Sequence, residues 1–216
     1  GGNVLFTGAV GGTRLGDIVI TNANNVTESA GVTAKSLTQS AGGGTTLLTG
    51  AVNTDGATGV ALTTSVITAN NTITTTNAGT VTFTNAGLLT LNGNITSDGA
   101  VVQNGAGATS ITSPRTITTT GDAVSFATGV TLNGAGTTSI NTTSGSATGA
   151  NVTFSSTLTG TTTDVEHLTV NAGSGGNVLF TGAVGGTRLG DIVITNANNV
   201  TESAGVTAKS LTQSAG

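Results

Sequence analysis

The sequence predicts an all-β protein built as a parallel β-helix, a rod-like β-solenoid with short strands and about 20 residues in each coil. Three observations lead to this fold class. The composition is poor in charged and large side chains, the chain contains a long identical repeat, and short alternating segments are separated by Gly and Asn turns. Repeats of this kind indicate an array in which each unit packs mainly on its neighbours.

Composition distinguishes a thin repetitive β structure from a disordered chain and from an ordinary globule. Charged residues make up 6% of the 216 residues, against roughly 25% in a typical soluble protein. Evenly spread Val, Ile and Leu argue against disorder. Five Phe, with no Trp, Tyr or Met, are too few large side chains for a thick core. Thr and Val suit pleated strands because they are β-branched, and Gly and Asn suit tight turns.

Residues 1–42 and 175–216 are identical, letter for letter. We therefore divide the chain into one full repeat, residues 1–174, and the start of the next, residues 175–216. The expected partners of each repeat are the neighbouring repeats of the same chain. At about 4.8 Å per coil, roughly ten coils give a rod of about 50 Å, and the two copies should superpose with an axial displacement of about 40 Å, or roughly eight coils.

Short segments that alternate apolar and polar residues recur between the turns, and no window shows helical spacing. Clear examples are Val4 with Phe6, Ile18 with Ile20, Val81 with Phe83, and Leu168 with Val170. Six such positions are interpreted as one equivalent structural core ladder, buried in the interior: Phe6, Leu48, Leu91, Phe126, Phe154 and Phe180. Their spacings are wide at first and narrower later, which indicates double coils first and single, longer coils at the end.

The pattern NVxFxG…LGDIxITNA…VTAxSLTQSAG…GAVNTxGxxGVxLT…TITTTNAGTVTFTNAGxLTL resembles the β-strand repeat regions of giant bacterial surface proteins, the filamentous haemagglutinin-like adhesins. The resemblance covers the whole chain. It implies a parallel β-helix stalk, export to the bacterial cell surface or matrix, and a role in adhesion or biofilm. It carries over no functional residue, because the stalk repeats of that group have no catalytic motif to match.

One acid–base cluster is present, formed by Asp164, Glu166 and His167. A carboxylate beside a histidine could serve general acid–base catalysis. A polar turn before the next strand is the favoured interpretation, because His167 is the sole His and no G-x-S-x-G motif accompanies it. Carbohydrate cleavage wants aromatic platforms and paired carboxylates, and the chain has no Trp or Tyr. We therefore expect no enzyme activity and no catalytic residue.

Acidic residues lie beside Gly at several turns, namely Asp17, Asp55, Asp98 and Asp122. Calcium takes several hard oxygen ligands, but the G-G-x-G-x-D motif is absent and residues 11–17 only mimic it with the wrong spacing. Turn chemistry explains these residues better, so no metal and no cofactor are expected. The basic residues are scattered, which argues against nucleic acid, and no apolar run reaches the roughly 20 residues of a membrane span.

The expected function is a structural stalk or filament segment of a giant repetitive extracellular protein. The alternative is a ligand-binding solenoid for ice or glycan that uses Thr-rich faces. Thr-x-Thr triplets at residues 72–74, 80–82 and 116–118 favour this alternative, but their irregular spacing argues against an unbroken grid. The chain begins and stops inside the repeat without evident caps, so unpaired coil edges should promote end-to-end or lateral self-association into fibres.

Overall fold

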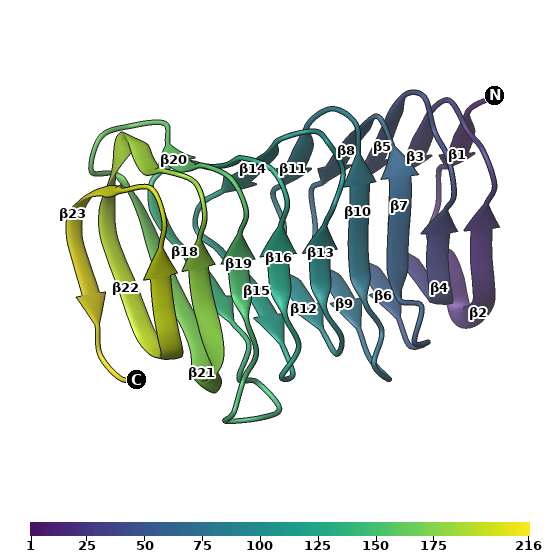
Figure 1. Cartoon of the computed structure of the whole chain (residues 1–216). Coiled ribbons are helices and arrows are strands. Elements are labelled where there is room, and N and C mark those ends of the chain that lie inside the picture. Colours follow the sequence, from purple (N-terminus) through teal and green to yellow (C-terminus); the bar gives the residue numbers. More distant parts are fainter.

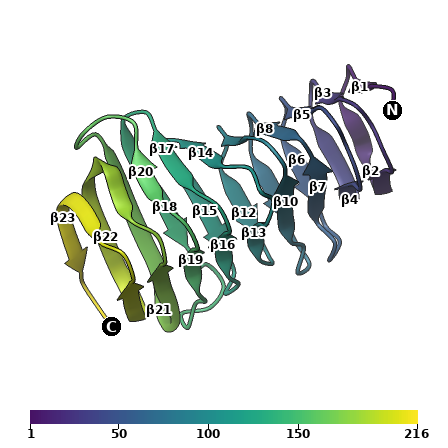
Figure 2. The same ribbon diagram turned by 45° about the horizontal axis from the view of Figure 1, so that its top comes forward.

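The computed structural model describes residues 1–216 as one stack of parallel strands coiled about a common axis (Figure 1). The fold is an all-β parallel β-solenoid of about 10 turns of roughly 22 residues each, and it contains no helix. The N- and C-termini lie at opposite ends of the stack (Figures 1 and 2). The predicted fold class is therefore confirmed.

Most coils contribute one strand to each of three parallel sheets, which we call faces A, B and C. Face A holds β1 (Val4–Phe6), β3 (Val26–Glu28), β5 (Thr45–Leu48), β8 (Val66–Ala69), β11 (Leu89–Leu91), β14 (Thr109–Thr112), β17 (Val130–Asn133) and β20 (Leu158–Gly160). Face B, towards the viewer in Figure 1, holds β7 (Val60–Thr64), β10 (Val81–Asn85), β13 (Val101–Gln103), β16 (Val124–Phe126) and β19 (Val152–Phe154). Face C holds β6 (Val52–Thr54), β9 (Ile73–Thr75), β12 (Ile95–Ser97), β15 (Arg115–Thr119) and β18 (Gly136–Asn141).

Five longer strands continue around corners and so belong to more than one face. They are β2 (Val10–Ile20), β4 (Val32–Gln39), β21 (Glu166–Phe180), β22 (Val184–Glu202) and β23 (Val206–Gln213). In β4, for example, Val32 pairs with Val52 of face C while Leu37 pairs with Val60 of face B. The order of faces along the chain is therefore A, C, B, and then A of the next coil.

The strands follow from the period-two pattern of the sequence. In β11, Leu89 and Leu91 point inward and are buried, whereas Thr90 between them faces outward. A cluster of 36 buried apolar residues fills the interior along the stack. Glycine is required where the corners of adjacent coils approach closely: a Cβ atom on Gly107 would collide with the backbone carbonyl of Gly87.

The six predicted core positions point inward, but they do not form one ladder. Leu48, Leu91, Phe126, Phe154 and Phe180 are buried, and Phe6 is half-buried. The strand registers place the first three positions on face A, in the series Phe6, Glu28, Leu48, Ala69, Leu91, Ile111, Leu132. They place the last three on face B, in the series Gln39, Leu62, Phe83, Gln103, Phe126, Phe154, Phe180, Glu202.

The expectation of a single equivalent ladder is wrong because the segment from Leu91 to Phe126 is not a whole number of coils. One coil leads from Leu91 to Ile111 on face A, and the chain then passes face C and reaches Phe126 on face B. The expected coil counts on either side of this step agree with the registers. Phe6 to Leu48 spans two coils, whereas Phe126 to Phe154 spans one longer coil.

The two identical segments pair internally in the same way but lie on different faces. Phe6 pairs with Glu28 on face A, and its equivalent Phe180 pairs with Glu202 on face B. Seven coils separate Phe6 from Gly160 on face A, and the chain then crosses two further faces to reach Phe180. The repeat period is thus seven and two-thirds coils, close to the expected value of roughly eight, and the copies differ by a third of a turn.

The exposed fractions of equivalent side chains in the two copies show how much surface a neighbouring coil covers. Leu15, with no coil on its outer side, is 46% exposed, while its equivalent Leu189 is 0% exposed. At the other end of the rod, Leu211 is 53% exposed, while its equivalent Leu37 is 3% exposed. The same sequence is therefore core or surface according to whether a neighbouring coil is present.

Candidate functional site

The predicted acid–base cluster does not converge. Glu166 and His167 are neighbours at the start of β21, so the strand alternation points Glu166 inward and His167 outward. The buried Glu166 carboxylate accepts hydrogen bonds from the Thr161 hydroxyl (2.6 Å) and from the Thr162 N–H (3.1 Å). Nδ1 of His167 accepts the backbone N–H of Asp191 (2.8 Å). The arrangement fixes a turn and a coil contact, as the favoured sequence interpretation predicted.

Asp164, the third member of the cluster, forms an ion pair with Arg188 of the following coil (2.5 Å). It has a left-handed backbone conformation, with φ of 65°, in the turn before β21. No group of three or more His, Cys, Asp or Glu residues in the chain is arranged to hold a metal ion. Three of the acidic residues beside Gly contact other coils: Asp17 binds Ser36, Asp55 pairs with Arg14, and Asp98 binds Thr120.

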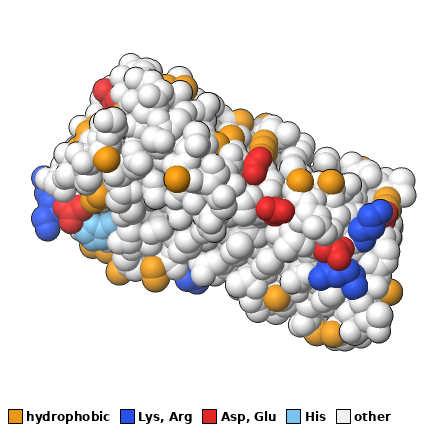
Figure 3. Space-filling model, turned by 90° about the horizontal axis from the view of Figure 1, so that it is seen from below, with side chains coloured by type: hydrophobic (Ala, Val, Ile, Leu, Met, Phe, Trp, Pro, Cys, Tyr) orange, Lys and Arg blue, Asp and Glu red, His pale blue; other side chains and the backbone are white.

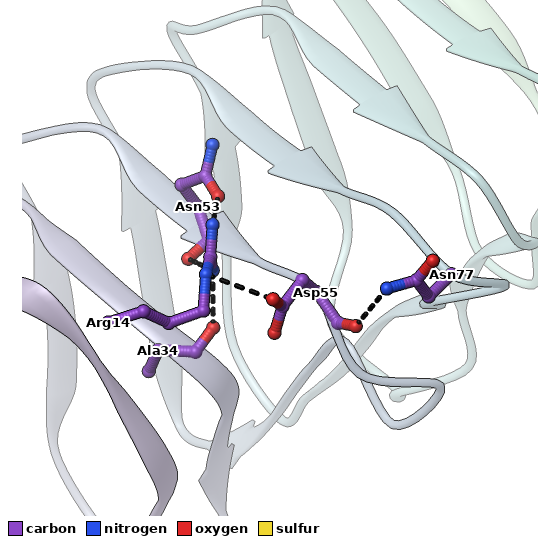
Figure 4. A network of polar contacts seen from close by, with 5 residues as sticks. All are labelled: Arg14, Ala34, Asn53, Asp55 and Asn77. Carbon is purple, nitrogen blue, oxygen red and sulfur yellow. Dashed lines mark hydrogen bonds and ion pairs between the residues drawn. The ribbon is translucent and has the colours of Figure 1, made fainter.

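Arg14 joins three successive coils and is the centre of a polar network that reaches a fourth (Figure 4). Its Nη1 donates to the carbonyl of Ala34 (2.7 Å), Nη2 donates to Oδ1 of Asn53 (2.6 Å), and Nε pairs with Asp55 (3.0 Å). Asn77 of the next coil donates its Nδ2 to the carbonyl of Asp55 (2.8 Å). The planar guanidinium suits this role because it offers several donors in a fixed geometry.

The same arginine of the repeat makes a different contact in the second copy. Arg14 reaches forward to Asp55, whereas its equivalent Arg188 reaches back to Asp164 of the preceding coil. In the first copy this side chain joins its coil to a coil that follows, and in the second copy it joins its coil to the one that precedes it.

Two aspartates stabilise neighbouring coils from the outer surface. Hydrogen bonds from the Ala78 N–H (2.8 Å) and then from the Thr120 hydroxyl (2.7 Å) lower the pKa of Asp98. A hydrogen bond from the Ser36 hydroxyl (2.7 Å), with the nearby charge of Lys35, lowers the pKa of Asp17. Each carboxylate is bound in its charged form by the adjacent coil.

Hydroxyl side chains form regular outward columns, which the sequence spacing conceals. On face A, five consecutive coils place a hydroxyl at the same outward position: Thr68, Thr90, Ser110, Thr131 and Thr159. On face C, three consecutive coils present Thr74, Thr96 and Thr118, followed by asparagines. The spacing is irregular in the sequence because coil lengths vary, while the hydrogen-bonded register keeps the columns straight.

Several polar side chains are buried at the corners of the coils, and the sequence analysis did not identify them. The Glu28 carboxylate is 1% exposed and accepts N–H groups of Ala30 (2.7 Å), Gly31 and Gly50 (2.9 Å). Asn85 and Gln103 are linked by a hydrogen bond of 2.9 Å in a similar buried network. The signal was available, because period two places Glu28 on the same inward side as Val26.

The remaining surface has no concentrated chemical feature. Most of the visible surface is uncharged, and charged side chains occur in small groups (Figure 3). A polar hollow of about 390 Å³ follows the asparagine column Asn151, Asn177 and Asn199 on face B. Oδ1 of Asn177 accepts the side-chain amide of Asn199 (3.0 Å), so the column is joined by its own hydrogen bonds.

Comparisons with protein-family models, with curated proteins and with solved structures find no match to this chain. The structure contains no helix with the length and hydropathy needed to cross a membrane.

Proposed function

We propose that the chain is a structural segment of a rod-shaped extracellular fibre, such as the stalk of a giant bacterial surface protein that acts in adhesion or in a biofilm matrix. Its function is length: it holds a binding tip away from the cell or forms a filament of the matrix. The proposal includes no catalytic role and no cofactor. It joins the β-solenoid fold to the family resemblance of the sequence.

The proposal rests on the way in which the second copy packs against the first repeat. The start of the second copy docks on residues 152–154 through the same parallel ladder that joins every other pair of coils on face B. Phe154 and Phe180 stack across this boundary with ring centroids 5.3 Å apart. The boundary between repeats is thus packed like the interior of a repeat, which supports a continuous array.

The test is the length of proteins that contain one, two and three copies of the repeat unit 1–174, measured by small-angle scattering and by electron microscopy. We expect each unit to add about 37 Å, from seven and two-thirds coils at roughly 4.8 Å, with no change in width. A protein that grows in all three dimensions, or whose units move as separate bodies, would refute the stalk. Display of the three-unit protein on bacterial cells would test the surface location independently.

Self-association through the coil ends is part of the proposal. Leu15 at one end and Leu211 at the other are exposed side chains whose equivalents are buried under a neighbouring coil. Unpaired strand edges template further pairing. Analytical ultracentrifugation of the whole chain should show association that rises with concentration, and Leu211→Lys should weaken it, whereas Val102→Lys on the side of the rod should not. A monomer at high concentration would contradict this part of the proposal.

The hydroxyl columns favour a second candidate function, binding of ice or glycan along one face. The face A column holds five hydroxyls at the spacing of successive coils, which is a regular array. Ice-recrystallisation and glycan-array assays on the whole chain would distinguish this function from a purely mechanical one. Thr90→Lys should abolish binding if the column is the site, and Thr82→Lys on face B is the matched control.

A further inference from the structure

The repeat period is not a whole number of coils, and this has a consequence for a tandem array. In the first copy Val10 lies on face C, Ile20 on face B and Phe6 on face A. In the second copy, Val184 lies on face A, Ile194 on face C and Phe180 on face B. Every position has moved by one face in the same sense.

The repeated segment packs against a different ladder in each copy. The ladder on face C carries Val52, Ile73, Ile95, Ile117, Ile140, Val170 and Ile194. Ile20, the equivalent of Ile194, lies on face B, where its coil neighbour is Gln39. Because both copies keep the same internal pairing, the strand-and-turn pattern of the repeated segment is independent of the face on which it starts.

We infer that successive repeats of the array are related by a screw of one-third of a turn, so that each surface feature of the repeat is presented in three directions around the rod. This inference rests on the proposed array. Three repeats, at three times seven and two-thirds coils, make 23 whole coils, after which a feature returns to its first face.

The charged groups of the repeat illustrate the arrangement. Arg14 lies at the corner between faces C and B, and its equivalent Arg188 lies at the corner between faces A and C. A third repeat would place the same arginine between faces B and A. A partner that recognises one patch of the repeat can therefore approach the stalk from any side.

The same screw disfavours lateral packing with a second copy of the rod. Two rods laid side by side would meet a matching patch over only one repeat, about 37 Å by the 4.8 Å rise, before that patch turns to another face. Attractive contacts would not add along the length. The array should thus remain a single rod.

Disulfide trapping tests the offset in the present chain, which contains no Cys. The registers place Thr153 beside Leu179 on the outside of face B. Strand neighbours at about 4.8 Å lie within the Cα separation that a disulfide spans, so the pair Thr153→Cys and Leu179→Cys should cross-link under mild oxidation. Eight whole coils would instead bring Thr159 beside Leu179, so the pair Thr159→Cys and Leu179→Cys is the matched control and should stay reduced.

Cross-linking of the control pair, or failure of the Thr153 pair in a chain with native circular dichroism, would overturn the offset. A cryo-electron microscopy map of a three-repeat protein then tests the array. We expect Phe6 and its equivalents in the next two repeats to lie on faces A, B and C in turn, in rods of single width. Rods with all three equivalents on one face, or rods paired side by side, would overturn the inference while leaving the stalk intact; the absence of any rod would refute the stalk.

Discussion

The stacked phenylalanines of face B provide a quantitative test of the packing, because the chain contains its own control. Phe180 is 2% exposed and stacks on Phe154, whereas Phe6, in an identical segment of sequence, is half-buried in the first coil. Truncating a buried phenylalanine to alanine costs about 3–5 kcal/mol, of which a ring stack contributes roughly 0.5–1.5 kcal/mol. Phe180→Ala should therefore lower the free energy of unfolding by about 3–5 kcal/mol.

Phe6→Ala should cost about 1–2 kcal/mol, since the stabilisation scales with the apolar area removed from water and this ring has no coil on its outer side. Urea unfolding followed by far-ultraviolet circular dichroism measures both values, as the chain has no Trp or Tyr fluorescence. Phe180→Leu, which keeps most of the volume, should cost less than about 1.5 kcal/mol. Equal losses for Phe180→Ala and Phe6→Ala would refute the reasoning that the neighbouring coil creates the core.

Three further predictions concern polar corners and glycine. Glu28→Gln should destabilise the fold by about 1–3 kcal/mol in urea unfolding, because the amide leaves buried N–H donors unpaired, while the exposed equivalent Glu202→Gln should be nearly neutral. The pKa of Asp98 is lowered in the folded chain, so its contribution to the free energy of unfolding is present above the unfolded-state pKa of about 3.9 and is lost as the pH falls through the folded-state pKa. The urea midpoint of unfolding should therefore drop in this acid range, and it should drop less in Asp98→Asn. Gly107→Ala should cost about 3 kcal/mol through its collision with the next coil, whereas Gly8→Ala, with open space around it, should be tolerated, as melting temperatures will measure.

Each of these has a distinct contrary result. Equal effects at Glu28 and Glu202 would mean that burial does not govern the carboxylate. A midpoint that rises towards acid pH would reverse the sign argued for Asp98. A melting temperature unchanged by Gly107→Ala would show that the corners of adjacent coils are less closely packed than the structure has them.

The sequence was sufficient to predict the fold class, because period two and turn residues recur in every coil. It was not sufficient to predict the phase, that is, which of the three faces each strand joins. From Leu91 onward, the turns vary in length, and the segment that leads to Phe126 contains no marker of which face each strand joins. Phase is set by hydrogen-bonded register between residues distant in sequence, such as Gln103 beside Phe126. For the same reason the Thr columns looked irregular in the sequence, although the fold aligns them.

The candidate polar contacts could be predicted only in part. The turn interpretation of the Asp164 cluster needed local sequence alone, since Glu166 and His167 must point to opposite sides of a strand. The Arg14 network needed the stacking of three coils, because Asn53 and Asp55 lie two coils further along the chain. Such contacts depend on coil length, which composition and turn patterns leave undetermined.

The direction of the hydrogen bonds determines how the rod would respond to tension. The chain has 123 backbone hydrogen bonds, and the parallel pairs connect successive coils along the axis. Pulling on the two termini, which lie at opposite ends, would load the bonds of a terminal coil first and detach that coil alone. A released turn of roughly 22 residues extends to about 75 Å at roughly 3.4 Å per residue, in place of the roughly 4.8 Å it occupied. Each released turn thus lengthens the chain by about fifteen times the rise that it had in the folded rod, and the rod can extend in this way one turn at a time.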